Sequence, residues 1–324
     1  MRIDCHVHVC AVTPGHGSMS QRVLRSMPFR FMRWRLGMKG EDEATERAVA
    51  AKLVETIDQT DALDAAVILA FDAVYDRDGR FDANNTHLYV TNDYAIELCR
   101  RDGKMLFGAS VHPYRKDAVA EIERCVKAGA VLMKWLPIVQ DIDPADERCV
   151  PFYEALAHYK LPLLSHTGGE KTLPNVNPNV MDPALLLGAL RRGVKVIAAH
   201  CGTRSAPGEP DYVPTFLRMA REHEHFYGDT AALNLPTRSY AYAQILGDAV
   251  VREKLLHGSD WPIIAVPPAM RIGLRESVRA LADRNWMRRD ITIKKMLGFD
   301  EAYFQRAAGV LRLTSDPATS APIR

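Results

Sequence analysis

The sequence predicts an α/β fold of the (β/α)8 TIM-barrel type in a single domain. Short aliphatic or β-branched runs alternate along the chain with longer segments that have helical spacing and charged faces. Such alternation is typical of βαβ units with parallel strands. The chain has 324 residues and eight strand-like runs, the number at which such a sheet closes into a barrel.

Each expected strand is a short apolar run. The eight runs are Ile3–Val9, Ala65–Phe71, Met105–Val111, Val131–Leu136, Leu161–His166, Lys195–His200, His225–Asp229 and Lys254–Asp260. The expected helices are Ala44–Thr60, Asn92–Asp102, Ala118–Ala128, Pro151–His158, Pro183–Arg192, Pro214–Glu222 and Tyr240–Val251. We therefore expect one barrel over residues 1–313. Residues 314–324 are rich in Ser, Thr, Ala and Pro and are expected to form a flexible tail.

Composition excludes several classes of function. The chain has 42 Lys and Arg against 40 Asp and Glu, too balanced for a nucleic-acid-binding surface. No apolar run approaches the roughly 18 residues that span a bilayer. The N-terminal residues form a strand-like run without a leader pattern, and the six cysteines lie far apart without a C-x-x-C pair. We expect a cytoplasmic protein that acts on a small molecule; the sequence leaves a homo-oligomer open.

Residues 11–40 form an insertion after the first strand, called the insertion below. Six basic residues and no acidic one occur in it: Arg22, Arg25, Arg30, Arg33, Arg35 and Lys39. Its apolar residues Leu24, Met27, Phe31, Trp34 and Met38 keep roughly helical spacing, which favours an amphipathic helix packed on the barrel. A lid that presents arginine to an anionic substrate and a membrane-surface contact are the alternatives.

A metal site is indicated by the first expected strand. Asp4, His6 and His8 alternate along it, so their side chains are expected on one face. Two neutral imidazoles at the C-terminal end of an inward-facing strand can chelate one metal ion. An H-x-H pair alone is weak evidence for such a site.

Four further polar residues strengthen this interpretation. His166, His200 and Asp260 end the fifth, sixth and eighth expected strands, and Lys134 holds the corresponding place on the fourth. Barrel enzymes build their active sites at this end of the strands. Buried in a core, each of these polar groups would need a partner.

The motifs DCHVHV, HTGG, AHCG and HGSDWP, in this order, resemble the amidohydrolase superfamily. Within it, the chain is similar to the amidohydrolase-related family that includes aminocarboxymuconate semialdehyde decarboxylase, over about residues 1–313. The resemblance implies that His6, His8, His166 and Asp260 are metal ligands. It also implies that His200 is a ligand of a second ion or a transition-state residue.

The state of Lys134 determines whether the site can bind one metal ion or two. In binuclear members of the superfamily a carboxylated lysine at this place bridges two metals, which implies that Lys134 is a ligand if two ions bind here. A carbamate forms only where burial or a nearby cation makes the amine neutral. We favour one ion over two, with zinc as the expected metal; manganese, cobalt and iron remain open. Alternatively, Lys134 binds a substrate carboxylate or pairs with Asp260.

Substrate contacts are expected on the rim of the barrel, from Arg204, His112 and Glu170. The expected reaction is metal-dependent hydrolysis of an amide, lactone or related carbonyl compound, because a bound ion lowers the pKa of water towards about 7. Asp260 would act as general base, and His200 would help stabilise the oxyanion. The resemblance also supports a metal-dependent non-oxidative decarboxylase, with the Arg-rich insertion or Lys134 holding the carboxylate. A non-catalytic ligand-binding barrel is the third alternative.

Overall fold

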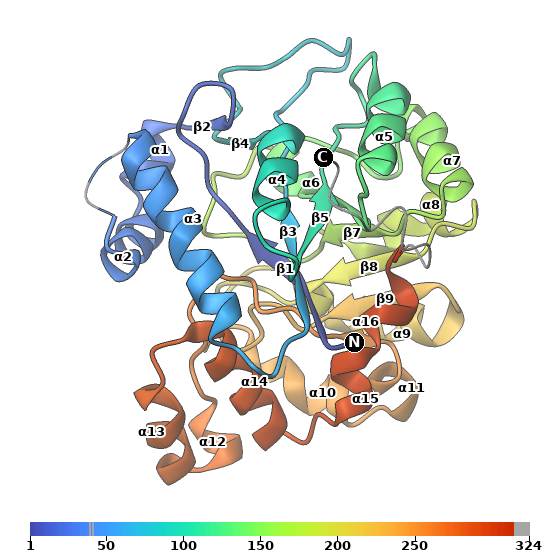
Figure 1. Cartoon of the computed structure of the whole chain (residues 1–324). Coiled ribbons are helices and arrows are strands. Elements are labelled where there is room, and N and C mark those ends of the chain that lie inside the picture. The colour runs from blue at the N-terminus through green and yellow to red at the C-terminus, as the bar shows by residue number, and fades with distance from the viewer. Residues whose placement is uncertain (39, 41, 314–324) are drawn as a thin grey trace.

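The computed structural model describes residues 1–38, 40 and 42–313, so Lys39 and the expected tail at 314–324 lie outside the described residues. Eight parallel strands form a nearly closed barrel in which each pairs with the next along the chain (Figure 1). They are β1 (Ile3–His8), β3 (Ala65–Leu69), β5 (Met105–Ala109), β6 (Leu132–Trp135), β7 (Leu163–His166), β8 (Val196–Ala199), β9 (Phe226–Asp229) and β10 (Leu255–Leu256). Backbone hydrogen bonds such as His8 N to Trp261 O (2.8 Å) and Asp260 N to His6 O (2.9 Å) connect the segment after β10 to β1. The (β/α)8 prediction is confirmed.

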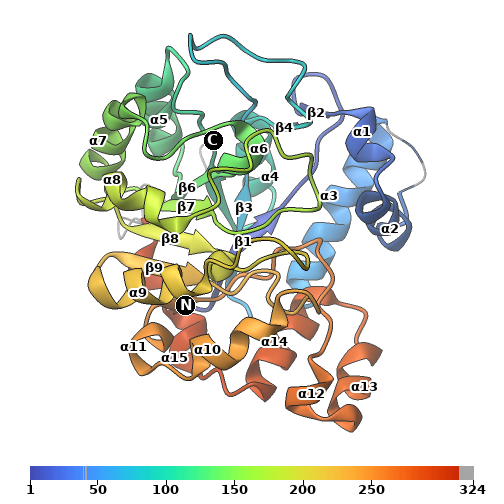
Figure 2. The same cartoon turned by 180° about the vertical axis from the view of Figure 1, so that it is seen from behind.

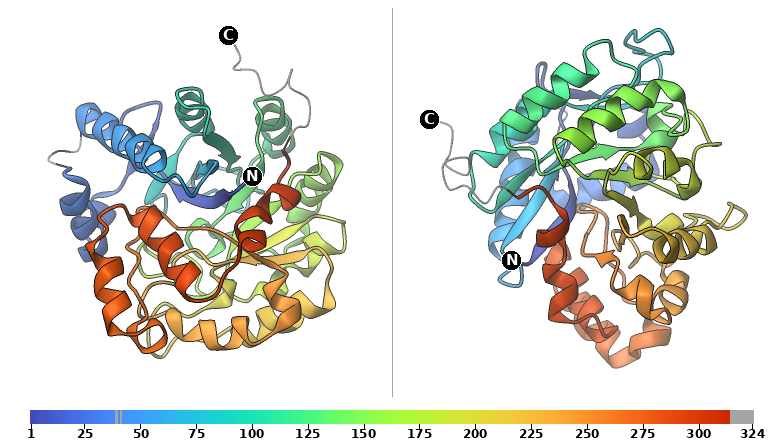
Figure 3. Two further views of the ribbon diagram at one scale, coloured as in Figure 1. Left: turned by 60° about the horizontal axis from the view of Figure 1, so that its bottom comes forward. Right: turned by 90° about the vertical axis from the view of Figure 1, so that its right-hand side faces the viewer.

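Helices surround the barrel (Figures 1 and 2). Those that follow strands are α3 (Glu43–Asp58), α4 (Asn92–Cys99), α5 (Ala118–Lys127), α6 (Pro137–Gln140), α7 (Val150–His158), α8 (Leu187–Leu190), α9 (Val213–Glu222), α10 (Tyr242–Leu246) and α11 (Ala249–Arg252). Short 3-10 helices cover Glu147–Cys149, Pro183–Leu186, His200–Gly202 and Ser239–Ala241. After β10 come α12 (Ala269–Ile272), α13 (Leu274–Ala282), α14 (Trp286–Met296), α15 (Glu301–Gln305) and α16 (Ala307–Val310). Figure 3 shows α16 beside the N-terminus at one end of the barrel.

Local sequence explains where the longer helices begin. Asp42 caps α3 by accepting a hydrogen bond from Thr45 N (2.9 Å), and Thr91 caps α4 by accepting one from Tyr94 N (3.2 Å). The two expected helices at 183–192 and 240–251 are each divided into shorter helical segments.

No helix in the described part of the chain is long and apolar enough to cross a membrane. All six cysteines are free.

A bulge in β1 determines which of its residues reach the site. Two residues, Cys5 and His6, lie between Asp4 and Val7 of β1, whereas only Val67 lies between their partners in β3, so the pairing register shifts there. Cys5 packs in the interior cluster, whereas Oδ2 of Asp4 lies 4.0 Å from Nε2 of His257, whose ring contacts α15. The expectation that Asp4 shares a face with His6 and His8 is wrong, because the extra residue interrupts the alternation of side chains.

The insertion holds β2 (Gly17–Met19), α1 (Gln21–Leu24) and α2 (Met27–Leu36), and β2 pairs with β4 (Leu88–Val90). Of the apolar residues predicted to face the barrel, Leu24 of α1 is buried, but α2 packs by a different face from the one predicted. Phe29 and Met32 are buried, whereas Met27 and Trp34 are 74% and 71% exposed. The predicted spacing fails because the chain leaves helical structure between α1 and α2, so residues 24 and 27 do not belong to one helix.

Candidate functional site

Three of the predicted metal ligands lie together at the C-terminal end of the barrel strands. Nε2 of His6 lies 3.0 Å from Nε2 of His8 and 3.4 Å from Oδ1 of Asp260. Nε2 of His8 lies 3.3 Å from the same carboxylate oxygen. Among the described residues these three form a group able to hold one metal ion. Two imidazole nitrogens and a carboxylate oxygen are donors that a divalent transition metal prefers.

The ring of His6 is oriented by a buried carboxylate. Nδ1 of His6 donates to Oδ2 of Asp229 at 2.7 Å, and neither side chain is exposed to solvent. Asp229 ends β9, and its other oxygen accepts hydrogen bonds from the backbone N of His200 (2.9 Å) and Ala231 (3.1 Å). A proton held at Nδ1 leaves the lone pair of Nε2 facing His8 and Asp260, as a metal ligand requires.

His200 and His166 are held in the same manner by backbone carbonyls. Nδ1 of His200 donates to Ala231 O at 2.8 Å, and Nε2 of His166 donates to Gly169 O at 3.2 Å. The His200 ring centroid lies 5.2 Å from that of His6 and 4.7 Å from that of His166. Burial holds the pKa of both histidines well below the ordinary value, so the second nitrogen of each carries a free lone pair.

Backbone strain also collects at this end of the barrel. His200 and Asp260 both have φ of 62°, in the left-handed region of backbone conformation that residues other than glycine rarely adopt. Both residues lie just beyond the strands that lead to them. Strain of this kind, maintained by surrounding structure, is typical of functional sites.

Lys134 lies at the buried base of the group. Its Nζ is 3.1 Å from Nε2 of His6, and its side chain is 1% exposed. Burial lowers the pKa of Lys134 to about 8, with Asp229 and Asp260 opposing that shift. A neutral fraction of the amine therefore exists near neutral pH.

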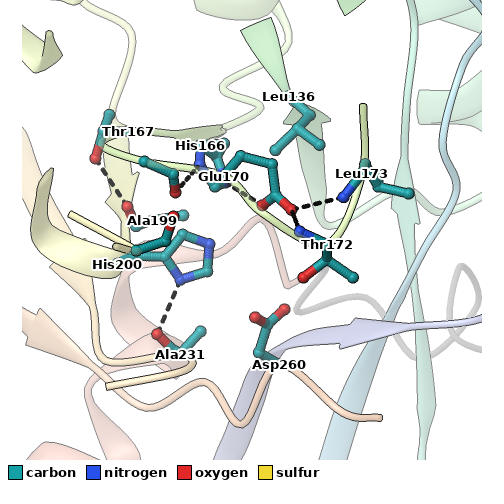
Figure 4. A network of polar contacts seen from close by, with 12 residues as sticks. Leu136, His166, Thr167, Glu170, Thr172, Leu173, Ala199, His200, Ala231 and Asp260 are labelled. Atoms are coloured by element: carbon teal, nitrogen blue, oxygen red, sulfur yellow. Dashed lines mark hydrogen bonds and ion pairs between the residues drawn. The ribbon is translucent and has the colours of Figure 1, made fainter. Parts of the chain in front are cut away.

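Asp260 and Glu170 face one another across the site. Figure 4 shows both carboxylates and the ring of His200 around a common space. Burial would raise the pKa of Asp260, but its interactions with His6, His8 and Lys134 outweigh burial and lower it. Burial raises the pKa of Glu170, whose Oε1 accepts a hydrogen bond from Leu173 N at 2.9 Å. Asp260 is thus the more readily ionised of the two.

A pocket opens from these residues towards the insertion. It encloses about 820 Å³, part of which is open to solvent, and His8, His166, Glu170, His200 and Asp260 line it. Side chains from β2, α2, α3 and β4 supply its opposite wall. The pocket therefore joins a polar floor to an apolar wall.

Two residues predicted to contact substrate lie elsewhere. His112 is fully buried with both ring nitrogens in use: Nε2 donates to Gln140 O (2.8 Å) and Nδ1 accepts from Tyr114 N (3.2 Å). Burial lowers the pKa of His112 to about 4. Arg204 packs its guanidinium over the ring of Tyr240, and neither His112 nor Arg204 lines the pocket.

Two residues that organise the site were not among those predicted from the sequence. Asp229 could have been found, because it ends the expected strand His225–Asp229 on the functional side of the barrel. Arg238 had no comparable signal, since it lies in a loop. Its guanidinium is buried and donates to Thr203 O (3.0 Å) and Gly169 O (2.7 Å), joining the loops that follow β7 and β8.

Comparison with known proteins identifies the family. The amidohydrolase family model matches residues 3–285, and no curated protein matches the sequence. A TIM-barrel protein from Bordetella bronchiseptica is similar in structure, with a TM-score of 0.60 and 16% identity over 95% of this chain and 99% of the other.

Two further structures share the fold. A protein assigned as a 2-pyrone-4,6-dicarboxylic acid hydrolase from Pseudomonas putida has a TM-score of 0.54 and 13% identity, over 100% of this chain and 98% of the other. A dihydroxybenzoic acid decarboxylase from Polaromonas, solved with manganese and 2-nitroresorcinol, has a TM-score of 0.50 and 16% identity, over 92% and 99%. These similarities show a common barrel. Because the family model covers nearly the whole chain, the protein belongs to the amidohydrolase family.

Proposed function

We propose that the protein is a metal-dependent hydrolase of a small carbonyl compound. The observation that carries this proposal is the group of His6, His8 and Asp260, whose ligand atoms lie 3.0–3.4 Å apart beside a pocket. Without an ion, such close packing of imidazole and carboxylate groups in a buried place is costly. A divalent ion would satisfy all three groups at once.

The residues present fit a divalent ion. His6, His8, His166 and Asp260 would hold it, and the hydrogen bonds of His6 and His166 already direct one lone pair of each ring away from its protein partner. His200 donates through Nδ1, so its Nε2 carries a lone pair and no proton. This nitrogen is therefore better suited to bind a metal than to donate a hydrogen bond to an oxyanion. This set favours zinc, although the Polaromonas decarboxylase structure contains manganese.

We favour one ion, with Lys134 as an unmodified amine beside His6. The buried position and lowered pKa of Lys134 also suit carbamate formation, which would allow a second ion with His200 as its ligand. Metal content and its response to substitution of Lys134 separate these two arrangements.

When bound, the ion supplies Lewis-acid activation of water and of a carbonyl group. Asp260 accepts the proton of the attacking water, because its lowered pKa keeps it ionised at neutral pH. The buried carboxylate of Glu170 borders the opposite side of the space and orients the substrate.

Hydrolysis is favoured over decarboxylation by the lining of the pocket. Among the described residues, no lysine or arginine lines it, so the described part of the insertion offers no cation for a substrate carboxylate, and Lys134 lies beside His6 rather than in the lining. Arg22, Arg25, Arg30 and Arg35 are exposed. The arginine-presenting lid considered from the sequence is not supported.

Product analysis tests this proposal. Metal-loaded protein is incubated separately with lactones, anilides and hydroxybenzoic acids, and acid products and carbon dioxide are measured. We expect a lactone or an anilide to be hydrolysed without carbon dioxide, and Asp260→Asn to slow this by about 10²–10⁴-fold. Asp58→Asn, at an exposed position, is the matched control. Carbon dioxide from a hydroxybenzoic acid, or undiminished hydrolysis by Asp260→Asn, would contradict the proposal.

A further inference from the structure

We propose that the substrate of this site carries an uncharged apolar chain or ring, which binds against the insertion. The inference rests on the proposed function, which places the reacting carbonyl at the polar floor. It adds the chemical class of the remainder of the molecule. It also assigns the insertion as the segment that selects for this class.

The observation behind it is that the polar lining residues gather in one part of the pocket. The polar lining residues lie at the ends of the barrel strands and in the loop after β7. The wall that faces them contains Phe29, Met32 and Leu36 of α2, Met19 of β2 and Leu88 of β4. A substrate with its carbonyl near Asp260 would therefore extend its other end over apolar side chains.

Charge points to the same class. The described lining residues include two carboxylates, Glu170 and Asp260, and no lysine or arginine. A substrate carboxylate against the apolar wall would lose hydration on entering and find no lysine or arginine in the described lining to pair with it. An alkyl or aryl group loses no hydrogen bonds there and gains from burial.

The two faces of α2 provide matched positions for a test. Met32 is 6% exposed and lines the pocket, whereas Trp34, two residues further on, is 71% exposed and does not line it. Leu36 lines the pocket from a half-buried position, at which a charged side chain is easier to accommodate. The same substitution can thus be made on either face of one helix.

Equilibrium binding of ketones measures this preference directly, because a ketone cannot be hydrolysed. The probes for titration calorimetry are cyclopentanone, 2-propylcyclopentanone, 2-pentylcyclopentanone and 3-(2-oxocyclopentyl)propanoate. We expect affinity to rise roughly fourfold for each added methylene. We expect the propanoate to bind more weakly than 2-propylcyclopentanone. Affinity that does not change with chain length, or a propanoate that binds as tightly as the propyl ketone, would overturn the inference.

Substitution locates the effect. Met32→Lys should remove most of the gain with chain length and strengthen binding of the propanoate, whereas Trp34→Lys should leave both unchanged. If Met32→Lys does not fold, judged by circular dichroism, Leu36→Lys takes its place. Equal effects of substitution on the two faces would overturn the assignment to the insertion. Failure to hydrolyse any lactone contradicts only the proposed reaction, since the ketone affinities do not depend on turnover.

Discussion

Replacement of Asp229 by asparagine tests how the site prepares His6 for a metal. In the wild type, Oδ2 of Asp229 accepts the Nδ1 proton of His6 at 2.7 Å, and its Oδ1 accepts two backbone N–H groups. Asparagine can keep the two backbone hydrogen bonds through its one oxygen. Its NH2 group then faces His6, so the ring must move its proton from Nδ1 to Nε2.

The expected loss can be estimated from this rearrangement. A proton on Nε2 removes the lone pair that would bind the ion, and loss of such a supporting carboxylate typically weakens metal binding about 10–100-fold. That range corresponds to about 1.4–2.7 kcal/mol. Turning the amide around would restore the bond to His6 but lose two backbone hydrogen bonds, at about 1 kcal/mol each. Neither orientation recovers the wild-type affinity.

The assay is competition for zinc with a chromophoric chelator, at a pH where both proteins are folded by circular dichroism. Asp58→Asn makes the same change at an exposed position and should retain wild-type affinity. A dissociation constant for Asp229→Asn within about threefold of the wild type would refute the reasoning, since it would mean that His6 does not depend on Asp229 for its proton.

Three further predictions concern stability. Lys294→Met leaves the buried Asp290 without its ion pair (2.5 Å) and should lower the free energy of unfolding in urea by about 3–5 kcal/mol; less than about 1 kcal/mol would contradict this. Burial raises the pKa of Glu46, but hydrogen bonds from His16 and the backbone outweigh it and lower the pKa. The resulting stabilisation is complete above the ordinary pKa, near about 4.3, and is lost as the pH falls through the lower folded value. The stability difference between wild type and Glu46→Gln should therefore shrink between pH 5 and pH 3, and a constant difference in urea unfolding would refute this. Gly108→Ala would place a methyl group 2.6 Å from Cδ2 of Leu69 and should cost about 1–3 kcal/mol by thermal unfolding, whereas an unchanged midpoint would show that the interior has room.

The barrel could be predicted because its strands are nearly continuous apolar runs. Both faces of a parallel barrel strand are buried, so runs such as Ala65–Leu69 stand out from the helices between them. Boundaries were less predictable. The eighth strand is reduced to Leu255–Leu256, and Asp260 lies four residues beyond it in a left-handed conformation that local propensity does not reveal.

The grouping of His6, His8 and Asp260 also follows from the sequence, because parallel barrel strands bring their C-terminal ends together. The position of Asp4 does not, since a bulge is a property of strand pairing rather than of local composition. The buried face of α2 was missed for a related reason. The break between α1 and α2 changes the helical phase, and only the packed structure shows where that break falls.

The central claim is that His6, His8 and Asp260 hold a divalent ion. Elemental analysis of protein purified without chelators and reconstituted with zinc tests it most directly, for the wild type, His8→Ala and His225→Ala. His225 is exposed and precedes β9, at the opposite end of the barrel. We expect about one ion per chain in the wild type and in His225→Ala, and a clear loss in His8→Ala. Wild-type protein that binds no ion, or His8→Ala that binds as much as the wild type, would contradict it.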